Sequence, residues 1–332
     1  MDNSLSPFLF EDNLHTLVWG TEAWIVSAVS SSPSVISNGK YAGKSLPEVV
    51  NMFPAEILGT KTSAQFSCHM PLLAKLIDAH QDLSIQVHPN DDMAQRLHHQ
   101  NGKSEMWYVI DAKPDSYIYS GFKEPLTKEQ YQQRVADGTI VDALAKHTVK
   151  PCDVFYLPSG RVHAIGRGIR LAEIQQSSDI TYRIFDYNRL GLDGKPRELH
   201  TEWALQAINF DVQSNYRTIY NYVENNSTHC IDSEYFSIRI INTKVPFHRN
   251  LVKFDSFVII MCIDGECQIV PRSNPSARVS VSTGKSCLVP AMMTNYDIIP
   301  DGRNVLLLEA FIDNKNRSLL HRSLRFLHIT SK

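Results

Sequence analysis

Short apolar segments separated by turn residues constrain the fold of this chain more than any other feature of its sequence. Segments with the length and composition of β-strands cover residues 24–30, 71–79, 83–88, 106–112, 115–122, 153–158 and 169–175. They are rich in Val, Ile, Tyr and Phe, and Gly, Pro, Asn or Asp separates them, as is typical of a sandwich or barrel. The segment PLLAKLIDA (71–79) fits a strand or a helix equally well. Strand-like runs return in the second half, so we expect an all-β-dominated fold.

Helices are predicted as small insertions between these strands. Ser45 with Glu48, and Thr127 with Gln130, form capping-box patterns that mark helix starts. A third helix is expected to start near Thr201. The predicted helical insertions cover about residues 45–52, 126–150 and 201–209.

The polar, turn-rich segment 221–229 indicates a domain junction. We therefore expect a first domain over residues 1–215, with the helical insertions, and a second β domain over residues 216–332. The basic C-terminal segment 314–332 is interpreted as a solvated terminal element without an assigned function.

Charge and cysteine content exclude several classes of protein. The chain has 332 residues with 33 Lys plus Arg and 35 Asp plus Glu, and this balance gives no electrostatic case for binding nucleic acid or an acidic membrane. Its six cysteines form no CxxC pair, which argues against a zinc ribbon or a dense disulfide framework and for a reducing compartment. The N-terminus has acids where a signal peptide is basic, and no apolar run is long enough to span a membrane. We expect a cytoplasmic protein and leave its oligomeric state open.

The segment DLSIQVHP (82–89) carries three polar side chains on one face. Because side chains alternate across a β-strand, Ser84, Gln86 and His88 lie side by side. The opposite face of this strand is apolar and consists of Leu83, Ile85 and Val87. A strand at the protein surface turns such a polar face to water, whereas a strand at a cavity turns it inward to an ion or a ligand.

Two further residues extend a candidate metal site, Glu105 in NGKSEMWYV and His163 in PSGRVHAIG. With Gln86 and His88 they offer an amide oxygen, two imidazoles and a carboxylate, which suit a borderline divalent ion such as zinc. Such a ligand set leaves room for a water or a substrate oxygen. Each residue alone has a structural explanation, such as a surface histidine or a turn glutamate, but the combination favours a metal site between neighbouring strands of a barrel.

Longer motifs surround these residues. They are LSIQVHP (83–89), GKSEMWYVIDA (102–112), PSGRVHAIG (158–166) and EIQQSSDITYRIFDYNR (173–189), flanked by WGTEAW (19–24) and RELHTEWAL (197–205). Through them the sequence resembles type I mannose-6-phosphate isomerases of the short bacterial form over about residues 15–210. The resemblance implies cupin-type double-stranded β-helix (jelly-roll) domains, one zinc ion per chain and a small sugar phosphate as substrate. Residues 211–332 resemble the family only in their β-rich character.

The resemblance also implies roles for individual residues. The positions that match the family's zinc ligands are Gln86, His88, Glu105 and His163. The positions that match its catalytic residues are Lys103, Glu173 and Arg183. Ser84 and Lys75 match positions that line the phosphate end of the pocket. Lys75 lies in an apolar segment, where it either binds phosphate or extends its stem to the surface.

The chemistry of an aldose–ketose isomerisation agrees with these roles. A proton moves between C2 and C1 through a cis-enediol, and negative charge develops on the carbonyl oxygen, which zinc can polarise. Glu173 lies in an apolar run that would raise its pKa, and it is the first candidate for the base, with Lys103 or a metal-bound water as rivals. Arg183 suits stabilisation of an oxyanion, because a guanidinium does not deprotonate in proteins, although an ion pair with Asp179 or Asp186 is the structural alternative.

The second β domain departs from the pattern of a metal-binding cupin. In SCLVPAMMTNY (286–296), Met292 and Met293 stand where a histidine would follow the proline, and methionine is a poor zinc ligand. We therefore expect one metal site per chain, in the first domain.

Two classes of function fit these observations. One is a zinc-dependent sugar-phosphate isomerase, and the other is a non-catalytic metal- or sugar-binding cupin with a regulatory role. Lys103, Glu173 and Arg183 favour the enzyme, because a binding protein needs no base and no oxyanion partner beside a complete set of metal ligands. An oxygen-using cupin would prefer iron and more histidine ligands, and Gln86 argues against it.

Overall fold

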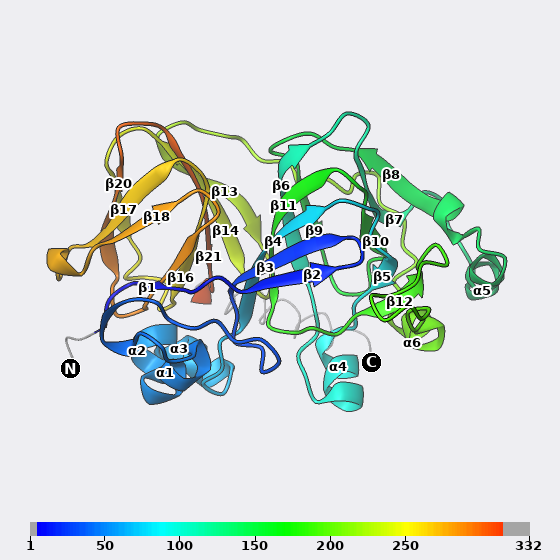
Figure 1. Cartoon of the computed structure of the whole chain (residues 1–332), viewed down its shortest axis with the longest axis horizontal. Coiled ribbons are helices and arrows are strands. Elements are labelled where there is room, and N and C mark those ends of the chain that lie inside the picture. The colour runs from blue at the N-terminus through cyan, green and yellow to red at the C-terminus, as the bar shows by residue number, and fades with distance from the viewer. Residues whose placement is uncertain (1–4, 315–332) are drawn as a thin grey trace, which may run out of the picture. The chain divides into compact units, whose positions relative to one another are not determined.

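The computed structural model describes residues 5–314, and antiparallel β-sheet predominates in it, as predicted (Figure 1). These residues form two compact units, and each is described by itself. Unit 1 contains residues 5–12, 25–71 and 219–314, and unit 2 contains residues 13–24 and 72–218. In the described part of the chain, no helix is both long and apolar enough to cross a membrane. The segment interpreted as a solvated tail lies outside the described residues from position 315 onward.

Unit 2 contains two antiparallel sheets. The six-stranded sheet has the order β2-β3-β4-β11-β6-β9, and its strands are Leu14–Leu17, Gly20–Val26, Leu72–Ala79, Ile169–Gln176, Glu105–Ala112 and Val154–Leu157. The five-stranded sheet has the order β12-β5-β10-β7-β8, and its strands are Tyr182–Phe185, Ile85–Val87, His163–Ile165, Tyr117–Phe122 and Leu144–Thr148. The segment PLLAKLIDA is thus a strand and not a helix. The strand predicted over 24–30 is found at Gly20–Val26 instead.

Helices of unit 2 cover one face of its five-stranded sheet. They are α4 (Asp91–His98), α5 (Lys128–Ala136) and α6 (Thr201–Ala207), with a 3-10 helix η2 (Ile140–Ala143). Ile85 and Val87 belong to one buried apolar cluster with Met93 of α4 and Tyr131 of α5. The prediction that Ile85 and Val87 face a neighbouring layer is therefore confirmed. It is wrong for Leu83, which precedes β5 and belongs to a separate apolar cluster with residues such as Trp19 and Trp107.

The predicted capping boxes are both present in full. Ser45 and Glu48 start α1 (Leu46–Met52) in unit 1, and Thr127 and Gln130 start α5 in unit 2. Each cap side chain accepts a bond from a backbone N–H that the first helical turn leaves free. The insertion over residues 126–150, predicted to be helical, is helical only in part. Residues 144–148 form the edge strand β8, which pairs with β7.

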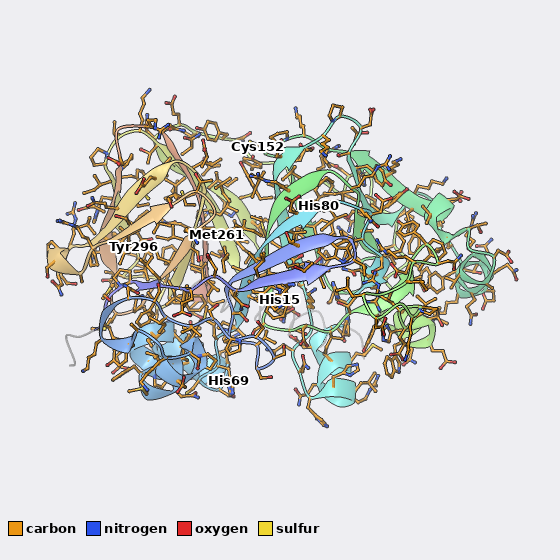
Figure 2. All side chains as sticks on the ribbon, viewed as in Figure 1. His15, His69, His80, Cys152, Met261 and Tyr296 are labelled. Atoms are coloured by element: carbon orange, nitrogen blue, oxygen red, sulfur yellow. The ribbon has the colours of Figure 1, made fainter. Side chains whose placement is uncertain are left out.

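Unit 1 also contains two antiparallel sheets. The six-stranded sheet has the order β1-β19-β16-β21-β14-β13, and its strands are Phe8–Leu9, Ser286–Val289, Val258–Asp264, Val305–Phe311, Ser237–Thr243 and Asn226–Asp232. The four-stranded sheet has the order β15-β20-β17-β18, and its strands are Phe247–Asn250, Asn295–Pro300, Glu266–Pro271 and Val279–Ser282. Met261 of β16 and Tyr296 of β20 are buried among these strands (Figure 2). The helices of this unit are α1, α2 (Pro54–Leu58) and α3 (Thr60–Gln65), with 3-10 helices η1 (Gly39–Tyr41) and η3 (Pro275–Ala277).

The structure differs from the predicted domains in the placement of residues 25–71. They belong to unit 1, with the second half of the chain, and not to a continuous domain over residues 1–215. Backbone hydrogen bonds explain this, since Ala291 N–H donates to Ile57 O and Met292 N–H donates to Glu56 O. The Asp255 carboxylate also accepts from the N–H groups of Thr60 and Lys61 at the start of α3. The C-terminal boundary of unit 2, between residues 218 and 219, lies close to the predicted one.

Candidate metal centre

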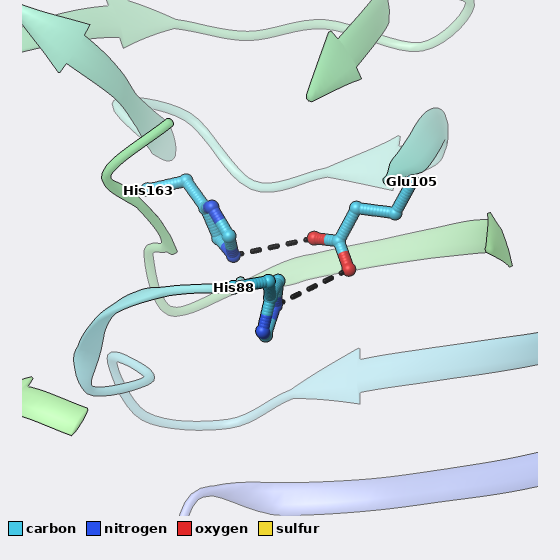
Figure 3. A group of neighbouring side chains, drawn as sticks. All are labelled: His88, Glu105 and His163. Carbon is cyan, nitrogen blue, oxygen red and sulfur yellow. Dashed lines mark ion pairs between the residues drawn. The ribbon is translucent and has the colours of Figure 1, made fainter. Parts of the chain in front are cut away.

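Three buried side chains of unit 2, on or next to three different strands, point toward one another (Figure 3). His88 follows β5, Glu105 begins β6 and His163 begins β10. Their ligand atoms all lie within 4.8 Å of one another, and the three residues are at most 1% exposed. The Nε2 atom of His163 lies 3.2 Å from Glu105 Oε1, and the Nε2 atom of His88 lies 3.4 Å from Glu105 Oε2. The structure thus brings together three of the four residues that the sequence analysis selected as metal ligands.

Gln86, the fourth predicted ligand, lies next to this group. It is the direct partner of His163 in the ladder between β5 and β10, so the two side chains share one face of the sheet. The Gln86 Nε2 atom lies 3.3 Å from the His163 Nε2 atom. If the Gln86 amide rotates by 180°, its oxygen takes the place of Nε2 beside His163, because the two ends of a glutamine amide have nearly the same shape.

Backbone carbonyls orient both imidazoles. The Nδ1–H of His88 donates to Ile180 O at 2.8 Å, and the Nδ1–H of His163 donates to Arg161 O at 2.8 Å. Burial, and next the charge of Lys103, lower the pKa of His88 to about 3, and burial lowers the pKa of His163 as well. Both rings are therefore neutral near pH 7, and both direct an Nε2 lone pair at the Glu105 carboxylate. Such a hydrogen bond on the far ring nitrogen is typical of histidines that ligate metals.

The residues present fit a divalent cation. Glu105 is 0% exposed, yet neither of its carboxylate oxygens accepts a hydrogen bond. Two imidazole lone pairs facing two carboxylate oxygens repel each other unless a positive charge lies between them, and an uncompensated buried charge costs several kcal/mol. Imidazole, carboxylate and amide ligands suit a borderline ion such as zinc.

Lys103 supplies part of the required positive charge. Its Nζ atom lies 3.3 Å from Glu105 Oε2 and 3.2 Å from His88 Nε2, and the residue is 5% exposed. Burial raises the pKa of Glu105, but neighbouring charges, Lys103 first among them, hold it well below its usual value, so the carboxyl group stays ionised. The structure therefore places the predicted catalytic lysine beside the candidate metal ligands.

A second group of charges lies in the six-stranded sheet of the same unit. Lys75 Nζ lies 3.2 Å from Glu173 Oε1 and 3.4 Å from Glu22 Oε2, and Lys75 is 5% exposed. The alternative in which Lys75 reaches the surface is therefore wrong. Burial raises the pKa of Glu173, as expected for an acid–base group, and the charge of Glu105 raises it further. Burial lowers the pKa of Lys75, but Glu173 and Glu22 raise it more, so the ammonium stays charged.

Arg183 and Ser84 lie on either side of Gln86. Arg183 of β12 is the direct partner of Gln86 in β5, its Nη1 atom donates to Glu198 O at 2.8 Å, and its buried Nε has no hydrogen-bond partner. The Ser84 hydroxyl donates to Gln86 Oε1 at 3.4 Å. Asp186, one of the two expected ion-pair partners of Arg183, instead binds two other arginines. These are Arg189, with its Nη2 atom 2.6 Å from Asp186 Oδ1, and Arg197, with its Nη2 atom also 2.6 Å away.

Three residues of this site were not predicted from the sequence, namely Glu22, Trp24 and Trp107. The indole N–H of Trp107 donates to Glu173 Oε2 at 2.7 Å, and the indole N–H of Trp24 donates to Glu22 Oε2 at 2.7 Å. The motif WGTEAW contains a signal that could have revealed two of them, a carboxylate two positions before a tryptophan in a strand. Lys75, the ion-pair partner of Glu22, lies about fifty positions further along the chain. Only the pairing of strands brings Glu22 and Lys75 together.

Comparison with known proteins gives consistent matches. A family model described as phosphomannose isomerase type I, catalytic domain, matches residues 17–117. The probable mannose-6-phosphate isomerase GmuF of Bacillus subtilis (strain 168) is 35% identical over 281 residues, which cover 83% of this chain and 85% of that protein. The mannose-6-phosphate isomerase ManA of the same organism is 37% identical over 254 residues, or 75% of this chain and 78% of that protein.

Solved structures extend the similarity to nearly the full chain. The crystal structure of the mannose 6-phosphate isomerase from Bacillus subtilis superposes with a TM-score of 0.80 at 28% identity, and the match covers 92% of this chain and 99% of that one. A putative mannosephosphate isomerase from Archaeoglobus fulgidus has the same fold, with a TM-score of 0.76 at 21% identity. The likeness in fold therefore continues beyond residue 210, where the sequence motifs end.

Proposed function

The chain belongs to the type I phosphomannose isomerase family of aldose–ketose isomerases, and from that membership we propose that it interconverts mannose 6-phosphate and fructose 6-phosphate. One zinc ion per chain would be held by His88, Glu105 and His163, with the amide oxygen of Gln86 as the fourth ligand. The observation that carries this proposal is the buried Glu105 carboxylate, whose two oxygens accept no hydrogen bond and face two imidazole lone pairs. A divalent cation would complete such a site, which Lys103 satisfies only in part.

The bound zinc would act as a Lewis acid that polarises the sugar's carbonyl oxygen. The protein's own side chains then complete the electrostatic environment. Lys103 lies beside His88 and Glu105 and adds a positive charge on one side. Arg183 contributes a buried Nε–H without a partner from the strand next to Gln86. Donors that are fixed before the reaction stabilise an oxyanion without reorganising.

Glu173 is the proposed base that moves the proton between C2 and C1 through a cis-enediol. Its Oε2 atom accepts the indole N–H of Trp107, whereas its Oε1 atom lies 3.2 Å from the Lys75 ammonium and accepts no hydrogen bond. The raised pKa of this carboxyl group brings it nearer to neutral pH, where a general base works best. Lys103 remains the rival candidate.

The roles of Ser84 and Lys75 at the phosphate end of the pocket stay predictions. Ser84 is buried and bonded to Gln86, which is compatible with a position near the substrate. Lys75 is already paired with two carboxylates, so its charge is better used to hold Glu173 than to bind a phosphate.

A coupled assay with mannose 6-phosphate tests the proposal. We expect turnover in the purified protein, loss of turnover with a chelator, and recovery when zinc is added back. Glu173→Gln should keep its metal and lose most turnover. Full turnover in the chelated, metal-free protein would contradict the metal's role, and full turnover in Glu173→Gln would place the base elsewhere.

We also propose a reducing, cytoplasmic location. All six cysteines are free, and Cys230, Cys262, Cys267 and Cys287 are buried. Free buried thiols are typical of proteins from reducing compartments. Thiol titration of the denatured protein, purified without a reductant, should give six free thiols per chain.

A further inference from the structure

Five buried or half-buried side chains form a symmetrical row in the six-stranded sheet of unit 2. In order they are Trp24, Glu22, Lys75, Glu173 and Trp107. The Lys75 ammonium lies between two carboxylates, at 3.4 Å from Glu22 and 3.2 Å from Glu173. Each carboxylate accepts one indole N–H at 2.7 Å, from Trp24 on one side and from Trp107 on the other.

The sheet itself fixes this row. β3, β4, β11 and β6 are consecutive neighbours and supply Glu22, Lys75, Glu173 and Trp107 in that order. Glu173 is the direct partner of Lys75 on one side and of Trp107 on the other, so these three side chains share one face. The row therefore rests on regular strands and not on loops.

We infer that Glu22 is a positioning residue for the isomerase reaction, which holds the Lys75 ammonium midway between two carboxylates and so keeps Glu173 free to act as the base. The inference rests on the proposed role of Glu173. Glu22 pairs with Lys75, and its own negative charge also raises the pKa of Glu173, in the same direction. Trp24 supports it twice, through its indole N–H and through its ring, which lies 4.9 Å from the Lys75 Nζ atom.

Glu22 affects the basicity of Glu173 because the two carboxylates compete for one ammonium, that of Lys75. If Glu22 loses its charge, Lys75 pairs with Glu173 alone, and a carboxylate that is bound more tightly to a cation is a weaker base. The other charges that face Glu173 are Glu105 of β6 and Lys103 just before β6, and neither changes in this comparison. Glu22 is mostly buried, with 15% of its side chain exposed, so water screens this interaction poorly.

The experiment compares Glu22→Gln with the parent enzyme loaded with zinc. We expect kcat to fall about tenfold, KM to stay within about twofold of the parent, and the bound metal to stay the same, as for other supporting residues of active sites. Because the base works only when deprotonated, kcat falls as pH drops through its pKa. The variant lowers that pKa, so the acid limb of the kcat profile should move to lower pH, by about one unit for a tenfold change.

Two further variants keep the test decisive. Trp24→Phe removes the hydrogen bond of Glu22 but keeps its charge, so it should move the acid limb much less than Glu22→Gln does. Glu202→Gln removes an exposed charge from α6 of the same unit and should match the parent. If Glu173→Gln is inactive while Glu22→Gln keeps the parent's kcat and pH profile, the inference is overturned and the proposed function stands. A loss of kcat in Glu22→Gln that comes with loss of metal also overturns it, because the residue would then be structural.

Discussion

Glu105 in unit 2 and Glu309 in unit 1 are both 0% exposed, but their surroundings satisfy them in opposite ways. Glu309 is enclosed by donors: the Arg249 Nε and Nη2 atoms lie 2.9 and 2.6 Å from its two oxygens, and the Tyr296 hydroxyl donates at 2.8 Å. Glu105 instead faces two neutral imidazoles that present lone pairs. One buried carboxylate has its counter-charge in the chain, and the other has only part of it, from Lys103.

The same kind of residue thus takes part in a closed ion pair in unit 1 and in a candidate metal site in unit 2. Burial lowers the pKa of Arg249, but Glu309 and neighbouring groups raise it more, so the guanidinium stays charged beside the carboxylate. An ion added there would meet the Arg249 guanidinium, which already balances the charge of the carboxylate. At Glu105 the acceptors outnumber the donors, and a divalent cation reverses that imbalance. The following predictions test this contrast, from the largest expected effect to the smallest.

Removal of one imidazole should abolish function in unit 2. We expect His163→Ala to lose its bound metal and to lower turnover by about 1000-fold or more, because a Lewis acid supplies several kcal/mol to the transition state. Elemental analysis and the coupled assay measure both effects. His80→Ala is the control, since that side chain is 66% exposed in the same unit, and it should match the parent. Metal retention at the parent's level in His163→Ala would refute the assigned ligand.

Loss of charge at Glu309 should affect stability and not metal binding. Glu309→Gln leaves Arg249 buried beside a neutral amide, and breaking a buried pair in this way costs about 3–5 kcal/mol. Denaturant unfolding measures the change, with Glu266→Gln, an exposed position of the same unit, as control. We expect the bound metal per folded chain to equal that of the parent. A free energy of unfolding that equals the control's would show that the pair contributes nothing.

Chelation should destabilise only proteins that hold the ion. An ion present at a hundred times its dissociation constant stabilises the folded state by about 2.7 kcal/mol. We therefore expect a chelator to lower the melting temperature of the parent and of Glu309→Gln by similar amounts. His163→Ala should show no change. A drop in His163→Ala as large as in the parent would mean that the chelator acts elsewhere.

Helix caps should give the smallest effects and should leave the chemistry intact. Ser45→Ala in unit 1 and Thr127→Ala in unit 2 each remove one capping bond, which costs about 1 kcal/mol. Denaturant unfolding should detect both losses, and turnover should match the parent for both. A loss of turnover in either variant would show that the cap residue does more than start its helix.

Local patterns in the sequence predict those structural features that depend only on residues close together in the chain. Both capping boxes lie within four consecutive residues, and the alternation of Ser84, Gln86 and His88 follows from the geometry of a strand. The motifs around Glu105 and His163 carry the family resemblance and lead to the ligands that the structure brings together.

The features that the sequence does not reveal depend on contacts between residues that are far apart in the chain. Glu22 meets Lys75 only because β3 and β4 are neighbours, and residues 25–71 join unit 1 through bonds to Asp255 and Ala291 far along the chain. The donors of Glu309 come from strands β15 and β20 of the opposite sheet. No periodicity within a single segment specifies which strands pair.

The most direct test of the contrast between the two buried glutamates is an anomalous X-ray diffraction measurement at the zinc edge on crystals of active enzyme. The account predicts one strong peak per chain, within bonding distance of the Nε2 atoms of His88 and His163 and of the Glu105 carboxylate, at about 2.0–2.2 Å. It predicts no peak at Glu309. Crystals of demonstrably active, metal-replete enzyme without a peak at Glu105 would contradict it.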